Sequence, residues 1–531
     1  MSEPGEAPVL AESEPAPISE NRGILRAALL LSLGNVTSRL LGLVREMVKA
    51  RLFGASGLLG AFTIATYVPN SIFQLIVGGE MVNSSLVPVF SEYANRAEDP
   101  ERKELWEVVT SFLSLAFFVL TLCVVLIELL AQPLAMLLGA DEFSDPALLE
   151  TTVSLMRLAA PAVLFLSLAS LISGVLYAMK RFTLPAFTAA ILNGTIVVVA
   201  LLHGDVSGLV WGLLLGSGLQ VVVQLPALRD ARFVRIDWRH PALRRILILY
   251  APIVAGLVVN QLAIGFSYRL AAGEADEAIA SMQFATTLLQ FPLGLVVTAL
   301  SIATLPTLSQ QANGSWEAYR KTLASGIRLV LTLILPATLG LFALAIPIVA
   351  LVFEWDNFTP DNTAVVALVL RFYLFGLPFA AVDQMLVFAS YARQDTWRPA
   401  LIGVISVAVY MVVALLLVGP LSYLCLMVAD TVKHIVHTVL MIWVLGRAQG
   451  GLRGYGIGPA LSKALAASLV MGVVAYFLWE LLVSWLPAGL LWSKLLLVGL
   501  PGLAGLLIYL AAVFLLDMKD AHALRRQFLR R

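Results

Sequence analysis

The sequence has little charge. Only 13% of its 531 residues are Asp, Glu, Lys or Arg, about half of the roughly 25% typical of soluble globular proteins. Hydrophobic residues make up 60% of the chain, in long uninterrupted runs, and the mean hydropathy is +0.89. These proportions exclude an ordinary soluble protein and predict an all-α polytopic membrane protein. Continuous runs, without alternation of period two, also argue against a transmembrane β-barrel.

Cysteines and catalytic signatures are equally scarce. The two cysteines, Cys123 and Cys425, both lie inside apolar runs, so no disulfide framework or metal cluster is predicted. No P-loop, GxSxG, HExxH or paired catalytic carboxylate motif occurs. We therefore expect a protein that is not an enzyme, has no cofactor and binds no nucleic acid. A coupling cation such as Na⁺ or H⁺ is left open.

Fourteen runs are long enough to span a membrane at about 20 residues each. They begin near residues 25, 58, 106, 148, 183, 206, 245, 279, 323, 363, 399, 421, 459 and 489. The loops between them alternate: one set, including "RDARFVRIDWRHPALRR" and "ARQDTWRP", always contains Lys or Arg. The other set, including "GADEFSDPALLE" and "EWDNFTPDN", contains neither. Because basic loops stay in the cytoplasm, both termini are expected there.

The chain also resembles itself. Residue pairs on corresponding spans recur at nearly constant offsets. Tyr177 and Tyr391, Arg157 and Arg371, and Pro185 and Pro399 are 214 residues apart, while Phe73 and Phe291, and Pro88 and Pro306, are 218 apart. Each repeat holds six spans, so both copies have the same orientation and are related by an axis along the membrane normal. Two such lobes are expected to enclose a site near the midplane.

The expected organisation has six parts. They are a disordered cytoplasmic tail (1–22), an N-lobe of six spans (23–228), a basic cytoplasmic linker (229–240), a C-lobe of six spans (241–447), two further spans (448–518) and a basic cytoplasmic tail (519–531). The first 20 residues contain no cation and are rich in Pro, Glu, Ala and Ser, which is typical of a disordered segment rather than a signal peptide.

The first span carries an unusual number of charges. Arg39 and Arg45 lie about 9 Å apart along a helix axis, at about 1.5 Å per residue. An uncompensated arginine at mid-bilayer costs at least ~2.5–3.5 kcal/mol, so these side chains are expected to face an anion-binding cavity. Two alternatives stay open: Arg45 pairs with Glu80 or Glu46, or Arg39 extends to the interface. Lys49 and Arg51 sit near the span's end, where extension to the interface is expected.

Acidic residues inside other spans are candidates for ion coupling. Glu80 lies deep in the second span, where it either relays protons or pairs with an arginine of the first span. Asp383 lies in the tenth span. Asp430 lies in the twelfth, followed by Lys433, His434 and His437. Asp and His on adjacent turns suit proton relay or binding of a small cation, and the alternative is a plain ion pair between Asp430 and Lys433.

Several motifs in combination resemble a known family. The runs "GNVTSRLLGLVREMVKARLFGASG", "VPN" at 68–70 and "LVPVFSEY" at 86–93 are similar to the amino-terminal signature of the MurJ (MviN) lipid II flippases. This family belongs to the multidrug/oligosaccharidyl-lipid/polysaccharide (MOP) exporter superfamily. "FPLGLVVTALSIATLPTLS" and "YARQDTWRPA" resemble carboxyl-half motifs of the same family. The resemblance runs over about residues 25–447.

The resemblance implies a fold and a function. The fold is a V-shaped pair of six-helix lobes around a cationic cavity, with residues 448–518 forming a groove for a lipid tail. The function is alternating-access transfer of lipid II across a bacterial cytoplasmic membrane in cell wall biogenesis. The implied partners are lipid II, membrane lipids and, as an open expectation, cell-wall synthesis proteins. A monomer is expected, because one chain supplies both lobes.

The resemblance also implies site residues. Ser38, Arg39 and Arg45 match cavity-lining positions, and Glu46 stands where an aspartate is usual. Arginines usual elsewhere in the family are replaced by Phe73 or Gln74 and by Thr287, and an aspartate is replaced by Gly60. Arg269 is a candidate for a third substrate-binding cation. Three alternatives remain: a flippase for another lipid-linked oligosaccharide, a MATE-like ion-coupled antiporter, and a non-transporting cell-wall scaffold.

Overall fold

The computed structural model describes residues 18–78, 81–96, 102–232, 234–312, 314–487 and 489–516, and all regular structure within these ranges is helical. In the first half the elements are α1 (Ile18–Phe53), α2 (Gly57–Val77), η1 (Val82–Leu86), α4 (Val87–Ala94), α5 (Lys103–Leu137), α6 (Ala147–Ala159), α7 (Ala162–Ala178), η2 (Pro185–Phe187), α8 (Thr188–His203), α9 (Val206–Gln224) and η3 (Leu225–Leu228). In the second half they are α10 (Pro241–Ala272), α11 (Ala278–Pro292), η4 (Leu293–Val297), α12 (Thr298–Ala312), α13 (Trp316–Ala343), α14 (Ala345–Phe353), α15 (Pro360–Leu374), α16 (Leu377–Ala392), α17 (Trp397–Leu421), η5 (Ser422–Leu424), α18 (Cys425–Gln449), α19 (Ile457–Val483) and α20 (Leu491–Leu515).

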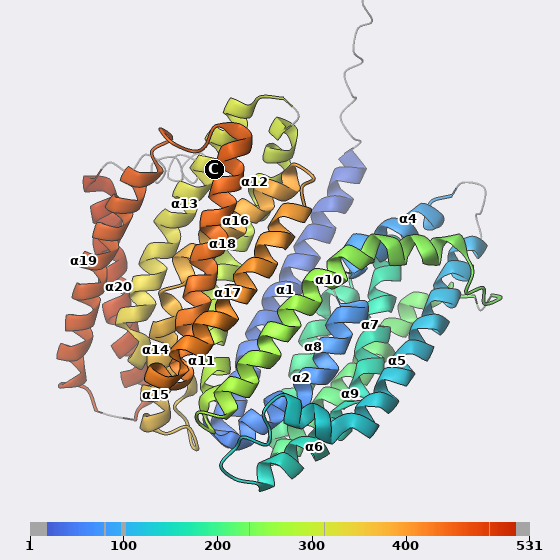
Figure 1. Ribbon diagram of the computed structural model, residues 1–531, viewed down its shortest axis with the longest axis horizontal. Helices are drawn as coiled ribbons and strands as arrows, with labels where there is room; N and C mark the ends of the chain where they lie inside the picture. The colour runs from blue at the N-terminus through green and yellow to red at the C-terminus, as the bar shows by residue number, and fades with distance from the viewer. Residues whose placement is uncertain are drawn as a thin grey trace, which may run out of the picture.

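The helices form two lobes that meet at one end and diverge at the other (Figure 1). The N-lobe contains α1–α9, and α8 packs extensively on α9. The C-lobe contains α10–α18, with α17 packed on α18 and α13 on α16. Two long helices connect the lobes: α1 packs on α8 and also reaches α14, while α10 contacts α17 as well as α2 and α5.

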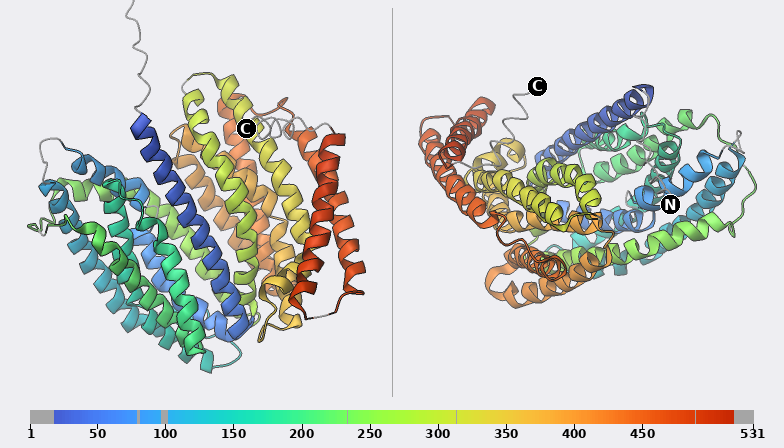
Figure 2. Two further views of the ribbon diagram at one scale, coloured as in Figure 1. Left: turned by 180° about the vertical axis from the view of Figure 1, so that it is seen from behind. Right: turned by 90° about the horizontal axis from the view of Figure 1, so that it is seen from above.

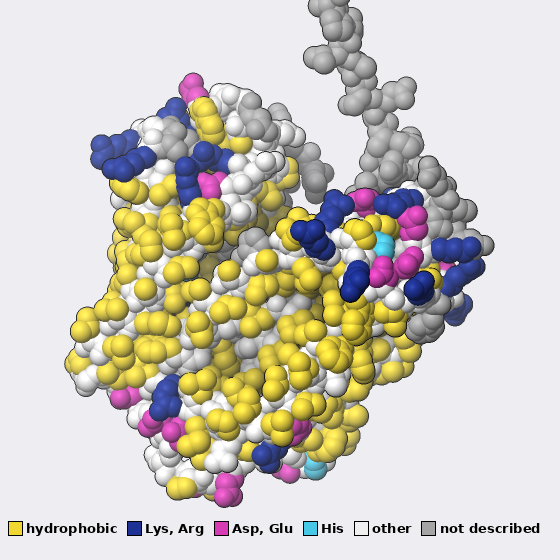
Figure 3. All heavy atoms as spheres, turned by 45° about the vertical axis from the view of Figure 1, so that its right-hand side comes forward, with side chains coloured by type: hydrophobic (Ala, Val, Ile, Leu, Met, Phe, Trp, Pro, Cys, Tyr) yellow, Lys and Arg dark blue, Asp and Glu magenta, His cyan; other side chains and the backbone are white. Residues whose placement is uncertain are grey.

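The two ends of the bundle differ in charge. We call the end where α1 begins the basic side, because the arginine-containing loops at 225–240, 393–396 and 450–456 lie there. The opposite end, the acidic side, carries the loops at 138–146, 273–277 and 354–359. Between these ends the surface in Figure 3 is covered by apolar side chains. This belt is the surface expected of a protein that faces lipid tails.

The arrangement is consistent with fourteen spans. Eleven segments are long and apolar enough to cross a membrane, or up to twelve if the pair α15–α16, bent by 46°, is one span. The charged helix α1 is outside this set. The segment Trp397–Arg447 is counted once, although α17 and α18 within it are separate helices that pack on each other around Ser422, where φ is 50°.

The internal repeat is visible in the helix breaks. The fourth span of the N-lobe is interrupted between α6 and α7, and the equivalent span of the C-lobe is interrupted between α15 and α16. The second span of each lobe contains a π-helical turn, η1 in one and η4 in the other. Because such turns are rare and cluster at functional sites, their recurrence supports duplication.

The two helices outside the repeat lie on the flank of the C-lobe (Figure 2). There α19 packs on α13, and α20 packs on α19 and α14. Lys494 fixes α20 in place: its Nζ donates to the backbone oxygens of Ala350 and Glu354 at 3.2 and 2.5 Å. It also lies 3.3 Å from the Glu354 carboxylate and over the Trp355 ring.

Close packing of α8 on α9 gives a test of the fold. A Cβ added at Gly212 would lie 2.7 Å from the Cα of Ile196, which is backbone and cannot yield. We expect Gly212→Ala to lower the free energy of unfolding by about 1–3 kcal/mol. Gly218, on the same helix, has no atom within 4 Å of its added Cβ, so Gly218→Ala is the matched control and should be neutral or slightly stabilising. Equal unfolding temperatures of the two variants in detergent would contradict this packing.

Candidate functional site

A cavity of about 260 Å³ lies between the lobes, with α1 on one wall and α11 on the other. We call it the inter-lobe cavity. It is lined by Arg39, Gly42, Leu43, Arg45 and Glu46 from α1 and by Gln283, Thr286, Thr287, Gln290 and Phe291 from α11. The N-lobe wall is therefore charged, and the C-lobe wall offers neutral amides and hydroxyls.

Arg39 lines this cavity without a partner among the described residues, because no hydrogen bond or ion pair forms on its guanidinium there. Its guanidinium lies against the backbone of Gly294, inside the π-helical turn η4. A Cβ added at Gly294 would come within 2.2 Å of Arg39 Nη1. The position of Arg39 thus depends on the absence of a side chain at 294, and its N–H groups remain available to an anion.

Arg45 has local partners. Its Nη2 and Nε donate to Glu46 Oε1 at 2.8 and 3.0 Å, and its Nη1 donates to Asn193 Oδ1 at 2.9 Å. The other carboxylate oxygen of Glu46 accepts from Lys49 Nζ at 2.8 Å. The ion pair with Glu46, one of the two alternatives for Arg45, is therefore formed. Lys49 does not extend to the interface as expected, since it is 4% exposed and lies over the Phe62 ring.

The charges of α1 leave a net positive wall. Glu46 pairs with both Arg45 and Lys49, and Arg39 adds a further cation on the same helix. Of these four residues Arg39, Arg45 and Glu46 line the cavity, so its α1 wall carries one net positive charge. Glu46 is 2% exposed and both of its oxygens are taken by cations. Glu46 thus holds Arg45 and Lys49 in place, and it also lines the cavity.

Two further predicted residues, Ser38 and Arg269, are not among those that line the inter-lobe cavity. Ser38 is not among the residues lining the cavity, and its backbone oxygen accepts from Asn193 Nδ2 at 3.3 Å, so this part of the residue joins α1 to α8. Arg269 lies at the acidic side, 2.8 Å from Glu142 and 3.5 Å from Asp141. Arg269 therefore connects α10 to the loop between α5 and α6 and does not line the inter-lobe cavity. Glu80 lies outside the described residues.

The lobes are joined on the acidic side. Arg51 at the end of α1 pairs with Asp356 of the α14–α15 loop at 2.6 Å. Asn357 Nδ2 donates to the backbone oxygen of Leu52 at 2.7 Å, and the backbone N–H of Ser144 donates to Asp276 at 2.8 Å. The inter-lobe cavity is thus closed toward the acidic side by contacts between loops, while the lobes diverge toward the basic side (Figure 1).

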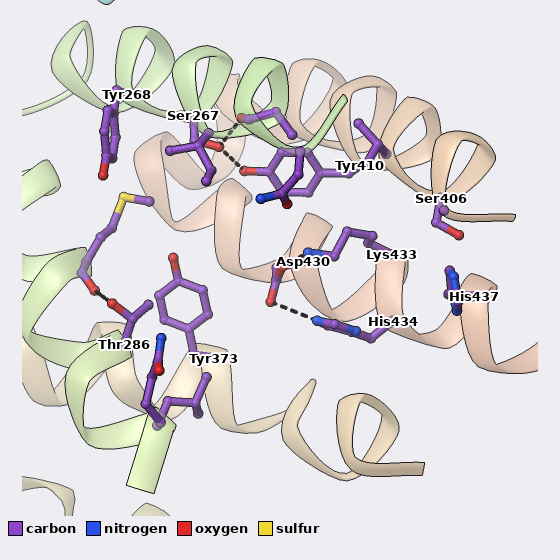
Figure 4. A pocket seen from close by; sticks show the side chains of 18 of the residues that line it. Ser267, Tyr268, Thr286, Tyr373, Ser406, Tyr410, Asp430, Lys433, His434 and His437 are labelled. Carbon is purple, nitrogen blue, oxygen red and sulfur yellow. Dashed lines mark hydrogen bonds and ion pairs between the residues drawn. The ribbon is translucent and has the colours of Figure 1, made fainter. Parts of the chain in front are cut away.

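A second cavity, of about 610 Å³, lies inside the C-lobe between α10, α11, α16, α17 and α18 (Figure 4). We call it the C-lobe cavity. Asp383 of α16 accepts a hydrogen bond from His437 Nδ1 at 2.5 Å. Lys433 Nζ donates to Asp430 Oδ1 at 2.5 Å, as expected for the plain ion pair. His434 stands between the two carboxylates.

The two cavities share a wall. Gln283, Thr286 and Gln290 of α11 line both of them. No group of three or more His, Cys, Asp or Glu side chains within the described ranges is arranged to hold a metal ion. Sequence reasoning missed Asn193, because it lies 148 residues from Arg45 and on a different helix.

Comparison with known proteins gives consistent matches. The family model described as lipid II flippase MurJ matches residues 49–496. The lipid II flippase MurJ of Burkholderia cenocepacia is 30% identical over 394 residues, covering 72% of this chain and 76% of the relative. The probable lipid II flippase MurJ of Bdellovibrio bacteriovorus is 28% identical over 522 residues, covering 96% and 97%.

Solved structures share the fold. A lipid II flippase MurJ in an inward closed conformation superimposes with a TM-score of 0.77 at 21% identity, over 92% of this chain and 99% of that one. An inward-facing MATE transporter of the MOP superfamily gives 0.66 at 15% identity, over 82% and 98%. The family model covers most of the sequence, and the two-lobed helical fold with a cationic inter-lobe cavity agrees with it. The chain belongs to the MurJ family of lipid II flippases.

Proposed function

We propose that this chain moves lipid II from the inner to the outer leaflet of a bacterial cytoplasmic membrane. The observation that carries the proposal is the cationic α1 wall of the inter-lobe cavity, where Arg39 and Arg45 outnumber the one carboxylate, Glu46, and Arg39 has no partner among the described residues. The head group of lipid II is joined to its polyprenyl tail through a pyrophosphate diester, which carries two negative charges. The site and its cargo are therefore opposite in sign.

The chemistry of the cavity suits a pyrophosphate. Arg39 offers uncommitted N–H donors in a planar fork, the geometry that phosphate oxygens accept. Such hydrogen bonds to charged groups contribute about 1.5–3 kcal/mol each. The amides of Gln283 and Gln290 and the hydroxyl of Thr287, across the cavity, suit the sugar hydroxyls. Without such a cavity, every unpaired polar group of the cargo would cost several kcal/mol in hydrocarbon.

We infer alternating access from the closure of the inter-lobe cavity on its acidic side. Because basic loops stay in the cytoplasm, the basic side faces inward and both termini are cytoplasmic. The lobes are held together on the acidic, outer side by Arg51–Asp356 and the loop contacts beside it. This conformation admits the head group from the cytoplasm. Breaking the outer contacts and closing the inner side delivers it outward, while the tail stays in lipid along α19 and α20.

The membrane potential supplies energy for this step. Moving two negative charges outward across 100 mV, inside negative, releases about 4.6 kcal/mol at about 2.3 kcal/mol per charge. Another lipid-linked oligosaccharide would share the pyrophosphate, so lipid II itself is the decisive ligand to test.

Removing the uncommitted guanidinium tests the site. We expect Arg39→Gln to abolish growth rescue in cells depleted of their own flippase and to weaken lipid II binding by the purified protein by about tenfold or more. Arg39→Lys keeps the charge but loses the fork, so an intermediate result is expected. Arg398→Gln is the control, because Arg398, at the start of α17, pairs with Asp395 of the preceding loop and does not line the inter-lobe cavity. Normal rescue and binding by Arg39→Gln would refute the pyrophosphate site.

The glycine that supports Arg39 gives a second test. In Gly294→Ala the new methyl group would displace the guanidinium, which is the far end of a flexible side chain. We therefore expect an unchanged unfolding temperature but weaker lipid II binding. Gly256→Ala is the control, since nothing lies within 4 Å of its added Cβ. Unchanged binding in Gly294→Ala would mean that the position of Arg39 is unimportant.

The outer closure gives a third test. An exposed ion pair is worth up to about 1 kcal/mol, so reversing one charge in Arg51→Asp should raise the population of the outward-open state about fivefold. The readout is the rate at which an impermeant thiol reagent, added outside, labels a cysteine placed at Thr287 in a background lacking Cys123 and Cys425. Adding Asp356→Arg should restore the slow rate. Equal rates in all three proteins would exclude a latch at this pair.

A further inference from the structure

The charged cluster in the C-lobe cavity is one positive charge short of neutrality. It contains two carboxylates, Asp383 and Asp430, and one ammonium, Lys433, together with His434 and His437. With both imidazoles neutral the cluster carries one net negative charge. Charge in a low-dielectric interior is costly unless compensated. Uptake of a single proton by an imidazole makes the cluster neutral.

His434 is placed to receive that proton. Its Nδ1 lies 3.9 Å from Asp383 Oδ2 and its Nε2 lies 3.7 Å from Asp430 Oδ2. Both distances exceed hydrogen-bond length, although one ring nitrogen faces each carboxylate. Only an imidazolium has a donor on both nitrogens. Protonation therefore lets His434 bridge α16 and α18 with two charge-assisted hydrogen bonds. To reach hydrogen-bond length, each of the two nitrogen–oxygen distances has to shorten by about 1 Å.

Among the described residues that line the cavity, no further charged side chain can neutralise the cluster. The titratable groups facing the cluster from neighbouring helices are Tyr268 of α10, Tyr373 of α15 and Tyr410 of α17. On α18 itself, Cys425 lies one turn before Asp430, and Lys433 also lies over the Tyr410 ring. The residues that α11 contributes to the cavity are uncharged.

We propose that this cluster binds one proton through His434, and that the proton enters when the anionic head group occupies the adjoining inter-lobe cavity. The proposal rests on the proposed function for the nature of the anion. The physical link is the shared wall of Gln283, Thr286 and Gln290. A net negative cluster beside the cavity repels a dianion, and a neutral cluster does not. Because linkage is reciprocal, the anion favours the protonated cluster to the same extent.

This linkage changes the charge that crosses the membrane. If the proton leaves with the cargo, one net negative charge moves outward per cycle instead of two. The cluster is thus a loading switch: acidity on the cytoplasmic side favours capture of the head group, and alkalinity favours the empty carrier.

The test is binding of lipid II to the purified full chain between pH 6 and pH 8, a range in which the pyrophosphate diester keeps a constant charge. For the wild type, the dissociation constant should rise with pH by up to about tenfold per unit, the limit for linkage to one proton. In His434→Gln the total change should fall below about twofold. Asp383→Asn makes the remaining acidic and basic charges equal, so it should also flatten the pH profile of binding. It tests the same prediction at a second residue, which keeps the test decisive if His434→Gln misfolds.

His203→Gln is the control, because His203 lies at the end of α8 in the other lobe. It should keep the wild-type slope. A flat wild-type profile, or an unchanged slope in His434→Gln, would overturn the proton switch while leaving the pyrophosphate site intact. If the wild type fails to bind lipid II at any pH, the proposed function itself fails. A profile that depends on replacing Na⁺ by choline at fixed pH would assign the cluster to a metal cation and so overturn the proposal.

Discussion

One buried carboxylate determines how α1 can hold so much positive charge inside a membrane. Glu46 accepts from Arg45 with one oxygen and from Lys49 with the other. Asn193 of α8 takes a further N–H of Arg45, so this cation is anchored to the N-lobe. Removing the carboxylate would leave the half-buried Arg45 and the buried Lys49 without the anion that they share, an arrangement that costs several kcal/mol. Glu46 therefore permits the cationic wall, and Arg39, about two turns away, is the member left to meet the cargo.

The duplicated lobes have taken different electrostatic roles. They share the interrupted fourth span and the π-helical turn of the second span. Yet the N-lobe contributes a wall with net positive charge, whereas the C-lobe contains a cluster in which carboxylates outnumber the ammonium. Helix α11 separates the two groups and presents only uncharged side chains, polar and apolar, to both cavities. A neutral partition of this kind prevents the two groups from forming ion pairs with one another.

The features that the sequence predicted are those that depend on local pattern. Apolar run length, loop charge and the offset of the repeat all concern residues close in sequence, and they led to the helical two-lobed fold. The placement of Arg39 on a cavity followed from the cost of its burial. What could not be predicted depends on side-chain direction and distant pairing. Arg269 was expected as a ligand but turns to Glu142, and Lys49 turns inward to Glu46 instead of outward. Asp383 and His437 meet across 54 residues, a distance that no spacing rule covers.

The attachment of α20 has a mechanical consequence. Lys494 is held by the backbone of α14 and by Glu354, and α19 is packed along α13, so the terminal helix pair and the C-lobe form one solid unit. When the lobes rock, this pair must tilt with its host. A hydrocarbon chain lying along this helix pair would tilt together with the C-lobe. The tail and the polar head group of a bound amphiphile would therefore be reoriented by the same conformational change.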